Sequence, residues 1–379
     1  MQTSSPKKIG VLTYHYVINY GAILQALGTL KALQCLGYEA ELIDYIPRYD
    51  RLSHRFMFGG SGGLRDGHIF SAIQMQRRFK SFLRQYMPLS RHYSSIEAVA
   101  HETFRYFAYM TGSDQVWNCK RFSDAKIKAA YDPIYFLDFP KQQTMHISYA
   151  SCFGRSDQPE ETLPMIRRSL QAFDALAVRN IFSQKLVECV VERKATLVVD
   201  PVFLVDFDRE TTTYQEKEPY MLIYSVNRGA MNRHMDTVRE IAQHLGLRMI
   251  AVTRTTLPGV DEHRRNLSPS DWLGLFQGAS YVCTDSFHGA AFSLKYQKPF
   301  TAFPKPGWSS MRILDLLQRY GLSHRAVTPE SPTVSTTPID WYAVTAALKV
   351  DIRASYSYLL SALQKKNVAA TLQQEDVAS

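Results

Sequence analysis

Apolar residues along the chain alternate between short strand-like runs and helical spacing, and this alternation predicts a parallel α/β fold. The clearest unit comes first, where an apolar run over residues 9–13 precedes a segment with helical periodicity over 22–36. Gly37 is a good helix terminator, and a second strand is predicted over 39–43. Because strand, helix and strand in this order form a βαβ unit, we expect the two strands to be parallel.

The same rhythm continues toward the C-terminus. A further helical region is predicted to end near Arg84, and Ser268, Pro269 and Asp271 carry the marks of a capped helix start. Glycine-rich residues 59–67 and polar residues 331–338 are predicted as loops. The remaining predicted strands are 106–111, 144–150, 175–178, 196–199, 221–226, 247–253, 281–283 and 299–303, and the remaining helices are 233–245, a helix that starts by Ala290, 310–317 and 340–365.

These elements predict two doubly wound, Rossmann-like domains that face each other across a cleft. The polar stretch 206–218 reads as the hinge between an N-terminal domain and a C-terminal domain. The predicted boundaries are 1–205 for the first domain, 206–218 for the hinge, 219–338 for the second domain, 339–366 for a C-terminal helix and 367–379 for a flexible tail.

Composition favours an ordinary globular protein. Of 379 residues, 45% are hydrophobic and 21% are charged, and no apolar run reaches the length of a membrane span. Five scattered cysteines form neither a CxxC pair nor a zinc pattern, and we interpret them as reduced core thiols of a cytoplasmic protein. No nucleic-acid-binding signature is present, so no nucleic-acid partner is expected.

The formal net charge of +9 is concentrated in the first half of the chain. Residues 74–84 are predicted to form an amphipathic helix with a basic face. Such a face could meet an anionic membrane or a diphosphate-linked substrate, and a solvated helix surface is the alternative interpretation.

The stretch TDSFHGAAFS, residues 284–293, is the strongest candidate for chemistry. Asp285, Ser286 and His288 lie between a predicted buried strand and a predicted helix. Ser286 is placed to cap that helix, and the small Gly289 would let a ligand approach the backbone. Free N–H groups at a helix start favour a phosphate or carboxylate, so this segment predicts an anion site with acid–base help from His288; a structural histidine is the alternative.

Three further polar clusters follow predicted strands. Asn19 and Gly21 can form a nest for an anion or hydroxyl after the first strand. The second cluster offers a carboxylate, two amides and an indole, which suits a sugar ring, although a turn with a buried tryptophan would look the same. Its members are Ser113, Asp114, Gln115, Trp117 and Asn118. Arg179 stands where a strand meets a helix, and Arg254 and Arg312 are placed as anion partners of the 284–293 segment.

Taken in this order, the clusters resemble the polysaccharide pyruvyl transferase family. The matching segments span most of the chain. They are NYGAILQALGTLKALQCLGYEAELIDY (19–45), GSDQVWN (112–118), YFLDF (135–139), ISYASCFG (147–154), VVDPVFLV (198–205) and DWLGLFQGASYVCTDSFHGAAFSLKYQKPF (271–300).

The resemblance implies a fold like that of the GT-B glycosyltransferases, phosphoenolpyruvate as donor, and a sugar of a surface or capsular polysaccharide, or of its lipid-linked precursor, as acceptor. Formation of a pyruvate ketal would need an acid, a base and cations for two anionic groups. We expect no metal and no cofactor, and a cytoplasmic location, either free or peripheral at the inner face of the membrane.

The expected catalytic residues are His288 as acid or base, Asp285 as its orienting partner, and Asp114 as base for the acceptor hydroxyl. Some family members carry Arg-Leu-His where this chain has Ser286-Phe287-His288, and there the arginine and histidine contact the donor. Another arginine must therefore replace the missing one. The expected donor residues are Ser286, Phe287, Gly289, Arg179, Arg254 and Arg312, and the expected acceptor residues are Asn19, Gly21, Gln25, Ser113, Gln115, Trp117 and Asn118.

Two other functions fit the same pattern. A GT-B glycosyltransferase with a nucleotide-sugar donor would share the fold and the anion site, although Lys295 and Lys298 stand where an acidic ribose-binding residue would be expected. A non-catalytic glycan-assembly protein on the same scaffold is the second alternative. A dinucleotide oxidoreductase is disfavoured, because no GxGxxG follows any predicted strand.

Overall fold

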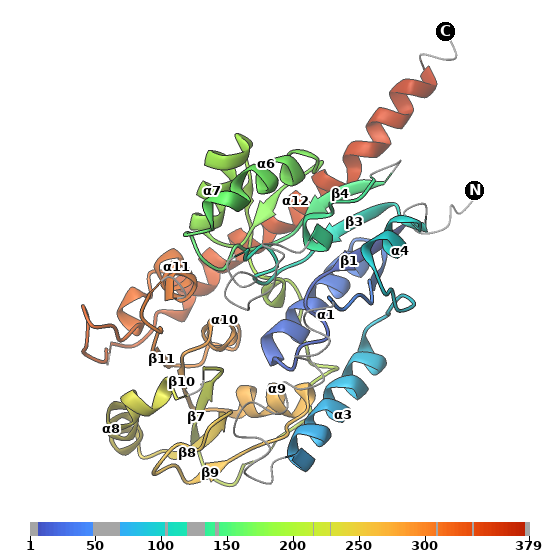
Figure 1. The fold of residues 1–379 in the computed structure, drawn as a ribbon. Helices are drawn as coiled ribbons and strands as arrows, with labels where there is room; N and C mark the ends of the chain where they lie inside the picture. Colours follow the sequence, from blue (N-terminus) through green and yellow to red (C-terminus); the bar gives the residue numbers. More distant parts are fainter. Residues whose placement is uncertain are drawn as a thin grey trace.

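The computed structural model describes residues 7–47, 69–102, 105–119, 133–140, 144–214, 216–227, 229–307, 310–335 and 337–375. Two parallel β-sheets, one in each half of the chain, form two lobes that pack against each other (Figure 1). This confirms the predicted α/β class with two doubly wound units. The predicted glycine-rich loop 59–67 lies outside the described residues.

The sheet of the first lobe has the strand order β2-β1-β3-β4, and all three pairings are parallel. Two isolated bridges, from Ile147 to Ala175 and from Ser151 to Val178, connect it to the small β5-β6 pair. The strands are β1 (Lys8–Leu12), β2 (Glu39–Leu42), β3 (Ala108–Thr111), β4 (Met145–Ser148), β5 (Ala177–Val178) and β6 (Thr196–Leu197). The helices are α1 (Tyr20–Cys35), α3 (Ile69–Tyr86), α4 (Ile96–Ala100), α6 (Leu163–Gln171) and α7 (Ile181–Val191).

The sheet of the second lobe has the strand order β11-β10-β7-β8-β9 and is parallel throughout. Its strands are β7 (Tyr220–Ser225), β8 (Arg248–Thr253), β9 (Glu262–His263), β10 (Tyr281–Thr284) and β11 (Phe300–Ala302). Its helices are α8 (Met235–Leu245), α9 (Pro269–Gly278), α10 (Phe287–Lys295) and α11 (Met311–Arg319).

Each sheet reverses its winding at one point. In the first sheet this switch lies between β1 and β3, and in the second between β7 and β10. Loops that leave the carboxyl ends of strands at such a switch form the usual ligand crevice of doubly wound folds. The loop after β3 contains Asp114 and the loop after β10 contains Asp285, so both candidate segments occupy these positions.

Local signals in the sequence fix the ends of several helices. Ser268 and Asp271 form a complete capping box at the start of α9, as predicted. Gly246 adopts a left-handed conformation (φ +60°) and closes α8, because glycine has no Cβ to oppose it. At α10 the prediction succeeds only in part: Ser286 occupies the N-cap position, but its side chain makes no capping hydrogen bond.

The lobes are joined by residues 198–219 and by a helix that returns across both. This helix, α12 (Trp341–Glu375), lies against the second lobe near its start and then runs along the first (Figure 1). Its Ser355 Oγ accepts from Val199 N at 3.0 Å, and its Tyr358 hydroxyl donates to Ser148 O at 2.8 Å. The helix continues to Glu375, well beyond the end predicted near Lys365, so the predicted tail from 367 is helical as far as this residue.

The lobes also touch directly. Tyr20 of α1 stacks on Trp272 of α9, with centroids 5.3 Å apart and planes 8° from parallel, and its hydroxyl donates to Leu267 O. One hydrophobic core includes residues of both sheets. In this arrangement the lobes are closed on each other beside the two switch points.

The predicted amphipathic segment with a basic face, residues 74–84, forms part of α3. It buries Phe79 and Phe82 and exposes Arg77, Lys80 and Arg84. The expectation of five core thiols is wrong. Cys119, Cys152 and Cys283 are buried, whereas Cys35 and Cys189 are exposed on helices, because they fall outside the apolar stripes of α1 and α7. Among the described helices, none is long and apolar enough to cross a membrane.

Candidate functional site

His288 lies in the first turn of α10 and faces the first lobe. Its side chain rests against Gly21 at the start of α1, where an added Cβ would come within 2.1 Å of the imidazole ring. Its Nε2 atom is 3.7 Å from Asp200 Oδ2, and the residue is 6% exposed. The imidazole is therefore buried, but it points to the contact between the lobes.

Asp285 does not orient His288. Its carboxylate accepts hydrogen bonds from Ser225 Oγ at 2.8 Å, from Val226 N and from Asn227 Nδ2. Burial raises the pKa of Asp285, although these hydrogen bonds oppose the rise. The three donors lie at the end of β7 and directly after it, so Asp285 connects the ends of β7 and β10 and does not hold the imidazole.

The other residues of the 284–293 segment shape the junction. Ser286 N donates to Thr284 Oγ1 at 3.1 Å. An added Cβ on Gly289 would lie 2.1 Å from Thr284 Oγ1, so glycine is needed for α10 to pack on β10. Phe287 is the member that reaches the other lobe, because the Arg179 guanidinium stacks 4.3 Å from its ring centroid.

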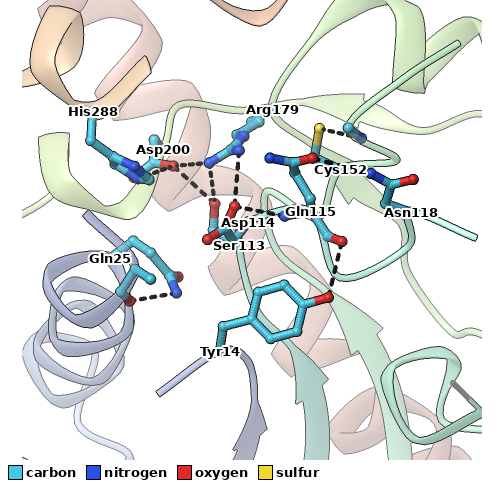
Figure 2. A network of polar contacts seen from close by, with 12 residues as sticks. Tyr14, Gln25, Ser113, Asp114, Gln115, Asn118, Cys152, Arg179, Asp200 and His288 are labelled. Carbon is cyan, nitrogen blue, oxygen red and sulfur yellow. Dashed lines mark hydrogen bonds and ion pairs between the residues drawn. The ribbon is translucent and has the colours of Figure 1, made fainter. Parts of the chain in front are cut away.

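Arg179 is the buried cation of the first lobe. Its Nη1 atom donates to Asp200 Oδ2 at 2.7 Å and to Ser113 Oγ at 3.3 Å. Its Nη2 atom lies 3.5 Å from Asp114 Oδ1. The side chains of Arg179 and Asp200 are both fully buried, which makes this ion pair the centre of the network in Figure 2.

Asp114 lies in the loop after β3, in a left-handed conformation (φ +80°) that few non-glycine residues adopt. Its Oδ1 atom accepts a hydrogen bond from Gln115 N at 2.8 Å. Burial alone would raise the pKa of Asp114, but Arg179, His288 and Arg312 together lower it. A strained, ionised carboxylate between three cationic or titratable groups is the kind of feature found at functional sites.

Arg312 completes the cationic side of the cluster from α11 of the second lobe. With the Gln115 amide oriented so that its oxygen faces Arg312, this oxygen accepts from Nη1 at 2.7 Å and from Nη2 at 3.1 Å. Burial and the neighbouring Arg179 lower the pKa of Arg312. The Nε atoms of both arginines are buried and have no hydrogen-bond partner among the described residues.

Of the three candidate arginines, Arg254 lies apart. It is exposed, and its Nη2 atom donates to the carbonyl of Ile18 at 3.3 Å across the lobes. The structure therefore brings Arg179 and Arg312, but not Arg254, to the cluster around His288.

Trp117 does not face the site. It is completely buried, its indole N–H donates to Tyr135 O at 2.9 Å, and its ring stacks on Phe136. The alternative of a turn with a buried tryptophan is thus the correct one, because an apolar pocket under the loop takes the indole. Asn118 lies beside the Gln115 amide, on the side away from Arg312.

The expected acceptor residues of the first βα loop have mainly structural contacts. Asn19 caps α1 by accepting from Ala22 N at 3.3 Å. Gly21 provides the space for His288, as described above. Gln25 is fully buried and donates to Thr13 Oγ1 and Ala22 O, while its Oε1 atom has no partner among the described residues.

Asp200 is the site residue that the sequence analysis missed. It follows the apolar run of β6 and precedes Pro201, in the segment VVDPVFLV. A single acid within an apolar segment is a signal that could have identified it, since buried carboxylates are rarely placed without a partner. The segment VVDPVFLV alone does not show which cationic side chain pairs with Asp200.

Two Rossmann-like lobes that face each other, with an imidazole, a buried arginine and a half-buried arginine where their switch points meet, define a two-lobed α/β protein of GT-B-like architecture. A sequence model of the family described as polysaccharide pyruvyl transferase matches residues 19–304. The chain belongs to this family. No curated protein matches it.

Similar solved structures include a glycotransferase of kitacinnamycin, which is 12% identical, with 95% of this chain and 98% of that chain covered and a TM-score of 0.48. Another is a putative UDP-N-acetylglucosamine 2-epimerase from Listeria monocytogenes, 11% identical, with 91% and 95% covered and a TM-score of 0.45. At these identities and scores, neither structure bears on the substrate of this protein.

Proposed function

We propose that this protein transfers a pyruvyl group from phosphoenolpyruvate to a sugar of a surface or capsular polysaccharide, or of its lipid-linked precursor, and forms a pyruvate ketal. Membership of the family supports transfer to a polysaccharide. The observation that carries the proposal is that His288, Arg179 and Arg312 lie in one cluster. The buried Nε donors of both arginines have no partner among the described residues. Two guanidinium groups suit a small ligand that bears a carboxylate and a phosphate.

The closed lobes must separate to admit these substrates. The cavity lined by Arg179 and Asp200 of the first lobe and by Phe287 and Arg312 of the second has a volume of about 10 Å³, the space of one water molecule. The contacts between the lobes in this region include the Arg179–Phe287 cation–π pair, the contact between His288 and Gly21, and the hydrogen bonds from Arg312 to Gln115. Opening would expose the arginines to the donor, and closing would remove water from the reacting groups.

The proposed reaction begins with proton transfer to the methylene carbon of phosphoenolpyruvate, which makes C2 electrophilic. One sugar hydroxyl adds to C2 and loses its proton, the C–O bond to phosphate breaks, and a second hydroxyl closes the ketal ring. Of the two hydroxyl protons, one restores the acid and the other leaves with the phosphate. His288 serves as the acid–base group beside the donor, Asp114 accepts the proton of the acceptor hydroxyl, and the arginines hold the donor anions.

The test measures phosphate release and the mass of a candidate glycan after incubation with phosphoenolpyruvate. Wild-type protein should release phosphate and increase the glycan mass by one pyruvate ketal. His288→Gln should reduce turnover by about two to four powers of ten, the usual effect of losing a general acid–base group. His244→Gln, which changes an exposed histidine of α8, is the matched control and should retain wild-type turnover. Turnover of His288→Gln within tenfold of wild type would remove His288 from the mechanism.

A further inference from the structure

Asp200 connects the two lobes through a single buried oxygen. Its Oδ2 atom accepts from Arg179 Nη1 at 2.7 Å and from Ser113 Oγ at 2.9 Å, and lies 3.7 Å from His288 Nε2. Arg179 and Ser113 belong to the first lobe and His288 to the second. Figure 2 shows His288 and Arg179 approaching the Asp200 carboxylate from different sides.

The second carboxylate oxygen of Asp200, Oδ1, makes a contact within the first lobe. Oδ1 accepts from Val202 N at 3.2 Å and caps the short helix η5 (Pro201–Phe203). This helix packs on α1, where an added Cβ at Gly28 would come within 2.7 Å of Pro201 O. The carboxylate is therefore anchored by the first lobe, and its Oδ2 edge is presented to the second.

The His288 ring is confined from two directions. Gly21 lies against one side, and the Asp200 carboxylate lies beyond Nε2. Nε2 is buried and has no hydrogen-bond partner among the described residues. A hydrogen bond between nitrogen and a carboxylate oxygen is about 2.8 Å long, so a movement of roughly 1 Å would complete one here.

We propose that Asp200 is a positioning residue for His288: in the closed arrangement of the lobes it holds the imidazole with Nε2 protonated, and a small movement of the ring completes the hydrogen bond between them. An imidazole N–H directed at a buried carboxylate has a fixed ring orientation and a fixed tautomer, as in catalytic histidine–carboxylate pairs generally. Because the pair spans the lobes, it assembles only in the closed state. The role in turnover rests on the proposed function, whereas the geometry of the pair does not.

The direct test is nuclear magnetic resonance of the full-length protein labelled with ¹⁵N-histidine, without substrate. Among the 11 histidines, the His288 signals are identified by their loss in His288→Gln. We expect the wild-type ring to carry a proton on Nε2, and Asp200→Asn to change the ring nitrogen shifts and to speed exchange of this proton at least tenfold. An unprotonated Nε2 in the wild type, or identical His288 signals in both proteins, would overturn the inference. If Asp200→Asn does not fold, the wild-type spectrum decides alone.

The kinetic test separates positioning from general stability. Asp200→Asn should lower kcat by about 10- to 100-fold, the usual effect of losing a partner that orients a reacting side chain, while KM for phosphoenolpyruvate changes less than threefold. Asp174→Asn is the matched control, because Asp174 also accepts a backbone N–H, from His146 at 2.8 Å, but precedes β5, whereas Asp200 follows β6, so the two lie at opposite ends of these paired strands. A kcat of Asp200→Asn equal to that of the control would refute a positioning role. A wild-type protein with protonated Nε2 but no turnover would refute the proposed function and leave the His288–Asp200 pair in place.

Discussion

Replacement of Arg179 by methionine should destabilise the protein strongly, in a way that depends on pH. Methionine keeps the apolar stem of the side chain but removes the charge that faces Asp200 at 2.7 Å and Asp114 at 3.5 Å. Removing one partner of a fully buried ion pair leaves an uncompensated charge and costs about 3–5 kcal/mol. We expect the free energy of unfolding of Arg179→Met at neutral pH to fall by that amount.

The pH dependence follows from the pKa of Asp200. Burial alone would raise it, but the contacts with His288 and Arg179 outweigh burial and hold it well below the usual value. The stabilising contribution of Asp200 is therefore complete above the pKa of an unfolded carboxyl, about 4, and is lost as the pH falls toward the lower folded-state pKa. Without Arg179 the pKa of Asp200 should rise, because the buried carboxylate can then relieve its charge by taking up a proton. The difference between variant and wild type should shrink between about pH 7 and pH 4.

The assay is urea unfolding followed by circular dichroism at several pH values in this range. Arg168→Met is the matched control, because Arg168 and Asp138 form a pair at 3.0 Å whose side chains are 69% and 30% exposed. An exposed pair of this kind contributes less than about 1 kcal/mol. If Arg179→Met loses no more stability than Arg168→Met, or if its deficit does not change with pH, the central ion pair is not the buried, ionised contact described here.

Two further substitutions test the placement of predicted site residues. Gly21→Ala would bring a methyl group within 2.1 Å of the His288 ring; we expect a folded protein by circular dichroism with phosphate release reduced at least tenfold, and wild-type release would show that the ring position does not matter. Trp117→Phe removes the 2.9 Å hydrogen bond to Tyr135 O and should cost about 1–3 kcal/mol of stability in urea unfolding. In the same variant KM for the glycan acceptor should stay within twofold of wild type, and a large increase would place Trp117 at the acceptor after all.

Local sequence signals were sufficient for the architecture. The capping box of Ser268 and Asp271, the left-handed Gly246 and the apolar strand runs each depend on neighbours within one turn or one strand. The polar clusters after the predicted strands are likewise local features. For this reason the sequence predicted both sheets and located the loops after β3 and β10 as candidate sites.

Local sequence signals do not predict contacts between segments that lie far apart in the sequence. Asp285 and Asp200 are both carboxylates that follow predicted strands, and only the packing of the lobes shows that Asp200 is the one beside His288. Arg254 and Arg312 are equally plausible cations in the sequence, but α11 turns Arg312 inward while Arg254 stays exposed. For the same reason, the sequence could not show that the indole of Trp117 enters the core of its own lobe.

The central claim is that the arginines and the imidazole between the lobes bind phosphoenolpyruvate, and calorimetric titration of the full-length protein tests it most directly. We predict saturable binding of phosphoenolpyruvate to the wild type, at least tenfold weaker binding to Arg312→Met, and no binding of UDP- or GDP-sugars under the same conditions. Binding of a nucleotide sugar without binding of phosphoenolpyruvate would contradict the account and favour a glycosyltransferase.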